Sequence, residues 1–186
     1  MKIKYNAPTV LTFALSSALT LALSQTLLPN LAEYWFMVPG KSGFSPSRLR
    51  DWVTLVSHIA GHANWTHLLG NFSIILLIGP MLEESYGSLS LLLMILITAL
   101  VTGVLNVLFF DASLMGASGV VFMMILLASF TNFNRGEIPL TFILILVLYL
   151  GEQLYSSLQT DNISQFAHIV GGFCGSLFGF FKPPQK

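Results

Sequence analysis

Six apolar runs constrain the fold of this chain more than any other feature. A helix that crosses a bilayer needs about 20 mostly apolar residues, and each run approaches that length: 7–29, 66–83, 89–110, 118–133, 139–155 and 166–181. Only 9% of the residues are charged, whereas a soluble domain carries about 25%. We therefore predict an all-α polytopic membrane protein, a six-transmembrane-helix bundle that forms a single domain over residues 1–186.

The basic residues beside the runs predict the orientation in the membrane. With six spans, one face receives Lys2, Lys4, Arg135, Lys182 and Lys186, and the other receives Lys41, Arg48 and Arg50. This excess places both termini in the cytoplasm, and the compact layout favours a bacterial inner membrane. The zero net charge argues against a nucleic-acid partner. An alternative for the first run is a cleaved signal peptide, although signal cores are usually about 7–15 residues long.

The first loop, about 31–64, is long and aromatic. Ser45-Pro46-Ser47 signals a helix start, and the residues after it recur at the spacing of one apolar helix face: Leu49, Trp52, Val53 and Val56. We expect a short helix lying in the membrane interface. Three tryptophans would anchor the chain at headgroup depth: Trp35, Trp52 and Trp65.

Polar side chains at membrane depth are costly and indicate function. Ser118 opens the fourth run, within Gly116-Ala117-Ser118-Gly119, and His168 lies near the start of the sixth. His67 and Asn71 are four residues apart and share a face of the second run. In the predicted topology these three runs all start on the outer side, so the polar groups converge there.

A hydroxyl beside an imidazole is the nucleophile–base pair of serine catalysis. At a helix start, the N–H groups of Ser118 and its neighbours lack intrahelical acceptors and can hold an oxyanion. Gly116, Ala117 and Gly119 would let a substrate backbone approach closely. The side chains of His67 and Asn71 can also donate hydrogen bonds. No carboxylate has an evident place behind His168, so we expect a Ser–His dyad. Taken alone, Ser118 could be a helix N-cap, and each of the other polar residues could be structural.

Small residues predict which runs meet. His168 shares a helical stripe with Gly172, Gly175 and Gly179, and glycines at this spacing allow another membrane helix to come very close. If that helix is the fourth run, its stripe would face the glycines and bring the serine to the histidine: Ser118, Phe122, Ile125 and Ser129.

In combination, these motifs resemble the rhomboid family of intramembrane serine proteases. The matches are His62-x4-His67-x3-Asn71, Glu83-x3-Gly87, Gly116-Ala117-Ser118-Gly119 and His168-x2-Gly171-x3-Gly175. The resemblance covers about 31–181, and each motif lies on the expected run. Glu83 and Glu84 fall at the opposite, inner end, where we interpret them as a structural pair.

The resemblance implies a six-helix bundle whose active site opens to the outside. Ser118 would be the nucleophile and His168 the general base. The oxyanion hole would comprise His67, Asn71 and the backbone N–H of Ser118. The fifth run would gate the entry of substrates, which are single-span or other transmembrane proteins cut near their outer ends within the lipid bilayer. The family uses no metal or organic cofactor.

Two positions depart from the family pattern. The family often has Trp-Arg in the first loop, where this chain reads Arg50-Asp51-Trp52-Val53. It commonly has tyrosine four residues after the serine, where this chain has Phe122. The ring is retained, so we expect it to stack on His168.

Two other functional classes remain open. A histidine-lined metal transporter would use His58, His62, His67 and His168 as ligands. Against it, no His-Glu-x-x-His motif is present, and the runs contain few acidic residues, namely Glu83 and Glu152. An inactive rhomboid relative would bind membrane clients without cutting them. That class normally lacks the serine or the histidine, and both are present here.

Overall fold

The computed structural model describes residues 3–130, 140–141, 143–144, 147–148 and 162–182. Its helices are α1 (Pro8–Gln25), α2 (Leu31–Trp35), α3 (Leu49–Ser57), the 3-10 turn η1 (His58–Ala60), α4 (Trp65–Tyr86), α5 (Ser88–Phe109), α6 (Ser118–Ala128) and α8 (Asn162–Phe181). By length and composition, α1, α4 and α5 could each cross a membrane, and α6 and α8 are shorter apolar helices. Most of the fifth predicted run, 139–155, lies outside the described residues.

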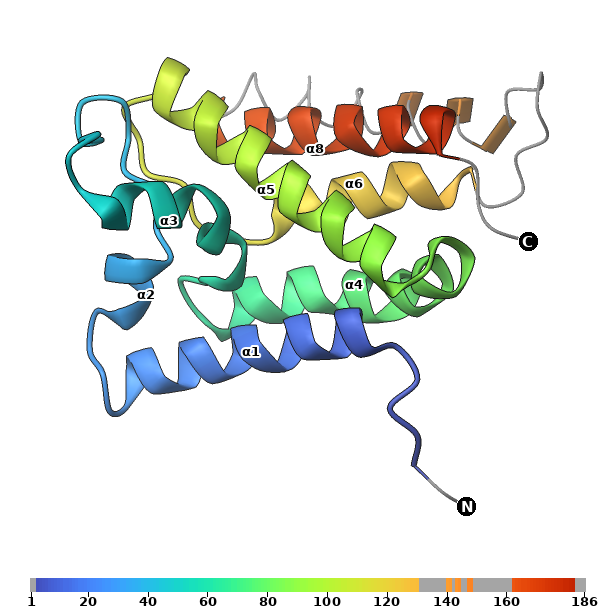
Figure 1. The fold of residues 1–186 in the computed structure, drawn as a ribbon, viewed down its shortest axis with the longest axis horizontal. Helices are drawn as coiled ribbons and strands as arrows, with labels where there is room; N and C mark the ends of the chain where they lie inside the picture. The colour runs from blue at the N-terminus through green and yellow to red at the C-terminus, as the bar shows by residue number, and fades with distance from the viewer. Residues whose placement is uncertain (1–2, 131–139, 142, 145–146, 149–161, 183–186) are drawn as a thin grey trace.

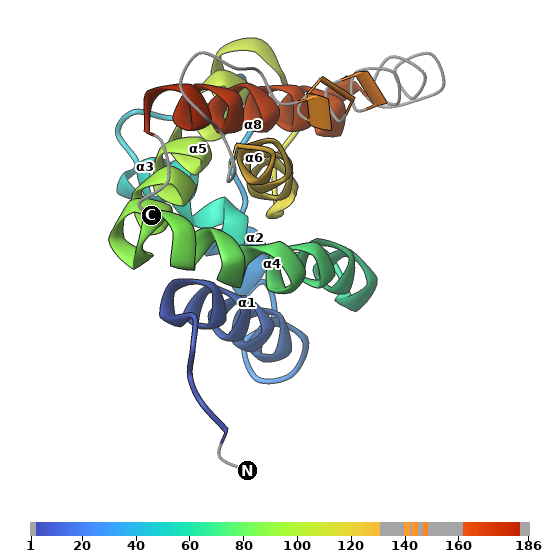
Figure 2. The same ribbon diagram turned by 90° about the vertical axis from the view of Figure 1, so that its right-hand side faces the viewer.

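The helices α1, α4, α6 and α8 run roughly side by side, and α5 slants across them (Figure 1). Seen along the bundle, α8 lies over α6, followed by α4 and then α1 (Figure 2). The helices α2 and α3 gather at the left-hand end in Figure 1, α6 begins on the side that faces them, and α1 begins at the opposite end. We call these the Ser118 end and the Glu83 end, after a residue that lies at each.

The Glu83 end is held by a carboxylate. Glu83, near the end of α4, accepts hydrogen bonds from the backbone N–H groups of Thr9 (2.9 Å) and Val10 (3.0 Å). These groups have no intrahelical acceptor in the first turn of α1, so the carboxylate caps that helix. Val10 packs against Gly79 of α4, where a Cβ atom would lie 2.8 Å from the valine side chain. The predicted structural role of Glu83 is therefore confirmed.

The closest helix contact joins α6 to α8 through glycines. A Cβ atom on Gly171 would overlap the carbonyl of Gly119, and one on Gly175 would overlap the carbonyl of Met123. One turn further, Gly179 lies against the ring of Phe130. The two helices therefore approach to backbone contact, which only residues without side chains permit.

These contacts confirm part of the predicted stripe and correct the rest. On α8, Gly175 and Gly179 contact α6 as predicted, and Gly171 rather than Gly172 meets Gly119. On α6, the contact falls one residue later than predicted, on Gly119, Met123 and Phe130. One residue corresponds to a rotation of about 100° on a helix, so Ser118 lies beside the helix contact rather than at its centre.

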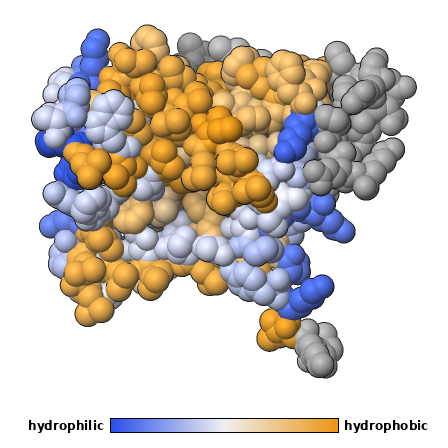
Figure 3. Space-filling view, in the orientation of Figure 1, coloured by the Kyte–Doolittle hydropathy of each residue, from blue (hydrophilic) through white to orange (hydrophobic). Residues whose placement is uncertain are grey.

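The first loop contains the predicted helix, α3. Its apolar residues face outward, with Leu49 78% exposed and Trp52 and Val53 about half exposed. All three tryptophans of the predicted headgroup belt are exposed as well. Hydrophobic residues cover most of the middle of the face shown in Figure 3, and the hydrophilic residues on it gather mainly at its two ends. An outward apolar face is what a helix in the membrane interface requires.

A buried carboxylate fixes this loop where the family often has Trp-Arg. Asp51 is fully buried, pairs with Arg48 (2.9 Å) and Arg50 (3.2 Å), and accepts a hydrogen bond from the N–H of Ser45 (2.8 Å). The Arg50 guanidinium also lies over the ring of Tyr34, 4.7 Å from its centre. Asp51 therefore ties the start of α3 to the segment before it.

Replacing Asp51 with alanine is expected to destabilise the protein by about 2–4 kcal/mol, because it leaves two guanidinium groups and a backbone N–H without their acceptor. The melting temperature of the purified protein in detergent measures this change. Glu33→Ala, which removes an exposed acidic side chain from the same loop, is the matched control and should leave the melting temperature unchanged. Equal melting temperatures for Asp51→Ala and the wild type would contradict the assignment.

Candidate active site

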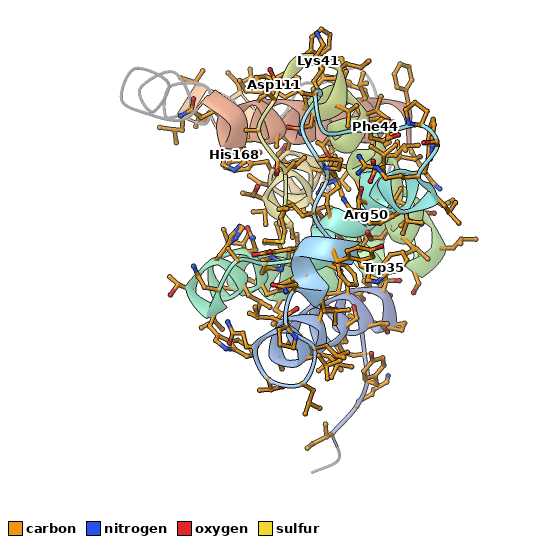
Figure 4. All side chains as sticks on the ribbon, turned by 90° about the vertical axis from the view of Figure 1, so that its left-hand side faces the viewer. Trp35, Lys41, Phe44, Arg50, Asp111 and His168 are labelled. Atoms are coloured by element: carbon orange, nitrogen blue, oxygen red, sulfur yellow. The ribbon has the colours of Figure 1, made fainter. Side chains whose placement is uncertain are left out.

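The segment that leads into α6 is tied to the first loop. Val38 and Leu114 exchange backbone hydrogen bonds of 2.9 and 3.0 Å. Asp111 accepts hydrogen bonds from the N–H and the hydroxyl of Ser42, and Figure 4 shows it beside Lys41 at the Ser118 end. Gly40 fits against the backbone of Asp111, where no Cβ atom has space. The position of Ser118 therefore depends on the first loop.

Gly116 makes the turn before Ser118. Its φ of +127° is a conformation that L side chains rarely adopt, and its N–H donates to the carbonyl of His58 (3.0 Å). Ala117, which is fully buried, is the N-cap residue, and Ser118 is the first residue of α6. The N–H groups of Ser118 and Gly119 therefore stand in the first turn, where the helix supplies no acceptor.

His168 lies on α8, beside the first turn of α6. Its imidazole packs on the ring of Phe122, with the ring centres 4.3 Å apart and the planes inclined by 37°. Phe122 is one turn after Ser118, and Ala167, the neighbour of His168, contacts Gly119. Both Ser118 and His168 are partly exposed, and Figure 4 shows His168 at the side of the bundle. The ring contact predicted for Phe122 is present, and it places the imidazole against the first two turns of α6.

His67 approaches the same place from α4. Its imidazole lies against Gly116, where a Cβ atom would be 2.6 Å from Cε1 and 2.7 Å from Nε2. The side chain of Asn64 caps the helix by accepting from the N–H of His67 (2.8 Å). The imidazoles of His67 and His168 are within electrostatic range of one another. Residues from α4, α6 and α8 thus meet around the turn at Gly116.

Asn71, one turn after His67, is 8% exposed, and its Nδ2 lies 3.1 Å from Nε2 of His62. We predicted that His62 serves loop hydrogen bonding, but this bond reaches a side chain of the predicted oxyanion hole. His62 is 1% exposed, and its ring lies edge-on to that of His67, with centres 5.0 Å apart.

The sequence gives no role to His58, and the structure supplies one. Its Nε2 is 3.1 Å from the carbonyl oxygen of Ala99 on α5, and its own carbonyl accepts from the N–H of Gly116. His58 therefore links α5 to the turn before Ser118. The four-residue spacing of His58 and His62 could not have indicated these roles, since His58 contacts α5 and His62 contacts α4.

Both of these histidines are neutral in the fold. Burial lowers the pKa of His58 from 6.5 to about 4. Burial and the nearby His67 lower the pKa of His62 to about 4 as well. Between pH 6.5 and pH 4 the unfolded chain therefore binds more protons than the folded protein. The contribution of these two neutral histidines to the free energy of folding is complete above about pH 6.5 and is lost as the pH falls toward 4.

The melting temperature in detergent is therefore expected to fall as the pH drops from 7 to 4.5. Each pKa unit corresponds to about 1.4 kcal/mol, so the loss approaches about 3 kcal/mol per histidine as the pH nears 4. Thermal denaturation across this range measures it. The melting temperature of His58→Gln, whose side chain cannot take up the proton, should change less with pH than that of the wild type. A flat profile for the wild type would contradict the buried neutral histidines.

Within the described residues, no group of three or more His, Cys, Asp and Glu side chains has the arrangement of a metal site. His67 lies against Gly116, two residues before Ser118, and His168 packs on Phe122, four residues after Ser118. This arrangement is suited to proton transfer and to the stabilisation of an oxyanion.

A protein-family model described as "Rhomboid domain" matches residues 49–185. The chain belongs to the rhomboid family. Similar proteins include "Rhomboid protease GlpG" of Haemophilus influenzae, 27% identical over 128 residues that cover 67% of each chain. "Rhomboid-related protein 1" of Caenorhabditis elegans is 32% identical over 160 residues, 76% of this chain and 43% of its own length. "RHOMBOID-like protein 7" of Arabidopsis thaliana is 32% identical over 127 residues, 64% of this chain and 39% of its own length.

This rhomboid spans two thirds of the length of the Haemophilus protein and about two fifths of the lengths of the other two. Membership of the family, together with helices apolar enough to cross a bilayer, makes it an integral membrane protein. The likeness to a relative named as a protease supports a rhomboid-type protease activity.

Proposed function

We propose that this rhomboid is an intramembrane serine endopeptidase in which Ser118 is the nucleophile and His168 the general base. The observation that carries the proposal is the packing of the His168 imidazole on Phe122, at 4.3 Å between ring centres, one turn from Ser118. The glycine contact of Gly119 with Gly171 supports it, because it fixes the register of the two helices beside the proposed pair.

The reaction follows from these positions. His168 takes the hydroxyl proton as the Ser118 oxygen attacks the carbonyl carbon of the scissile peptide. The oxyanion is stabilised by N–H groups in the first turn of α6 and by the side chains of His67 and Asn71. When the tetrahedral intermediate collapses, His168 returns the proton to the leaving amine. A water molecule, deprotonated by His168, then hydrolyses the acyl-enzyme and releases Ser118.

The substrates are transmembrane segments of other membrane proteins, cut near their outer ends. We place the chain in a six-helix bundle, with the fifth span in the run 139–155. Both termini lie in the cytoplasm, and the Ser118 end faces the outside of a bacterial inner membrane. Polar groups at the Ser118 end support this placement, because water for hydrolysis must reach the acyl-enzyme from that side.

The test is proteolysis of a generic single-span substrate by detergent-purified protein, with the wild type beside Ser118→Ala. Cleavage by the wild type alone supports the proposal. Equal cleavage by both proteins would indicate a contaminating protease, and the assay would then not support Ser118 as the nucleophile. If neither cleaves a panel of single-span substrates, while both retain them on a pull-down, the protein binds clients without cutting them.

A further inference from the structure

Asn71 has two N–H groups on its side chain, and the structure accounts for one of them. Nδ2 lies 3.1 Å from Nε2 of His62, which is hydrogen-bonding distance. An amide nitrogen donates and cannot accept, so Nε2 of His62 must be the acceptor. The second N–H of Nδ2 then remains for another acceptor. In the proposed reaction that acceptor is the oxyanion.

This bond also fixes the proton on His62. In a neutral imidazole one nitrogen accepts and the other carries the proton, so the proton of His62 is on Nδ1. Nδ1 is buried and has no hydrogen bond of good geometry to the described residues, and the backbone of Ala60 lies close enough to favour a proton on the ring. The bond to Asn71 therefore fixes the imidazole and the carboxamide relative to one another.

The surroundings hold the His62 ring firmly in place. It packs on the ring of Phe72, with centres 5.6 Å apart, and edge-on to His67. The preceding residue, Gly61, lies in close contact with Phe36, where a Cβ atom would be 2.6 Å from the side chain. A ring fixed by packing and by tight backbone contacts can act as a template for a neighbouring group.

Building on the proposed function, we propose that His62 is a positioning residue, which holds the Asn71 carboxamide so that its free N–H points at the oxyanion. Without the acceptor on His62, the carboxamide can turn and present its oxygen, which repels the developing negative charge. His62 acts only through Asn71 and touches neither the substrate nor the reacting atoms.

This role sets an upper limit on the effect of losing His62. Removal of one oxyanion donor costs about 10²–10³ in rate, and this is the effect expected for Asn71→Ala. Loss of the residue that orients the donor is expected to cost less, because the freed carboxamide turns between its two orientations and still presents its N–H to the oxyanion in part of the molecules. We expect His62→Leu to lower kcat about tenfold with little change in KM, since the oxyanion forms only after the substrate has bound.

The test is a double-mutant cycle on kcat, measured on a cleavable single-span substrate. His62→Leu should lower kcat about tenfold in the wild type and less than about twofold in Asn71→Ala. His62→Gln should restore most of kcat, because its side-chain oxygen can accept from Asn71. A matched cycle pairs His62→Leu with Ser90→Ala, at the Glu83 end, and should be additive. Melting temperatures of all variants report loss of folding separately.

Two results would overturn the inference. One is an equal loss of kcat on replacing His62 in the presence and absence of Asn71. The other is equal kcat for His62→Gln and His62→Leu at equal melting temperatures. Ser118→Ala in the same assay reports on the proposed function itself. If Ser118→Ala cleaves as well as the wild type, the proposed function fails. If Ser118→Ala is inactive but the effects of His62→Leu and Asn71→Ala are additive, only the role of His62 is rejected.

Discussion

Replacement of His168 with alanine is expected to lower kcat by at least about 10⁴-fold, because Ser118 then has no base to take its proton. The fold should survive. His168 is only partly buried, and the backbone contacts of α8 with α6 run through Gly171 and Gly175 rather than through the imidazole. The effect should therefore appear in kcat and leave the melting temperature nearly unchanged.

Single-turnover cleavage of a single-span substrate measures this loss. Ser176→Ala is the matched control on the same helix, because the Ser176 hydroxyl donates to the carbonyl of Gly172 (3.0 Å), within α8 itself. That variant should cleave like the wild type. A His168→Ala protein that retains more than about a hundredth of wild-type kcat would contradict the assignment of His168 as the general base.

Replacement of Gly171 with alanine is expected to cause the second largest loss. A Cβ atom there would lie within 3 Å of several backbone atoms of Gly119, so α6 and α8 must move apart. A displacement of about 1 Å at catalytic groups can cost about 100-fold in rate. We therefore expect kcat to fall about 100-fold or more, together with a lower melting temperature, because the closest helix contact is lost.

The matched control is Gly70→Ala on α4, where a Cβ atom meets nothing within 4 Å. Alanine is favoured over glycine inside a helix by about 0.5–1 kcal/mol, so this variant should melt at the wild-type temperature or slightly above it. Parallel thermal denaturation and cleavage assays compare the two variants. If Gly171→Ala behaves like Gly70→Ala, the α6–α8 contact does not set the geometry of the site.

Patterns confined to one helix could be predicted well from the sequence. The spacing of Leu49, Trp52 and Val53 predicted α3 and its apolar face, and both are confirmed. The second and third apolar runs correspond to α4 and α5 within a few residues at each end. Periodicity succeeds here because it depends on neighbours three and four residues away.

Contacts between distant segments could not be predicted in the same way. The contact on α6 falls on Gly119 and Met123, about 100° of helix rotation from the predicted face, and on α8 both Gly171 and Gly172 satisfy the small-residue pattern equally. The bond from His62 to Asn71 joins a loop to a helix, so no helical period relates the two. Asp51 lies in a motif that departs from the family pattern, and its burial depends on where the arginines fold. Only the three-dimensional packing decides these cases.

Covalent labelling tests the central claim, that Ser118 is a nucleophile activated by His168, without requiring a known substrate. The folded protein in detergent is treated with a fluorophosphonate, and the adduct is located by mass spectrometry of peptides. The account predicts a single adduct on Ser118 in the wild type, and its loss in His168→Ala at an unchanged melting temperature. An adduct on another residue, or equal labelling of Ser118 in His168→Ala, would contradict the account.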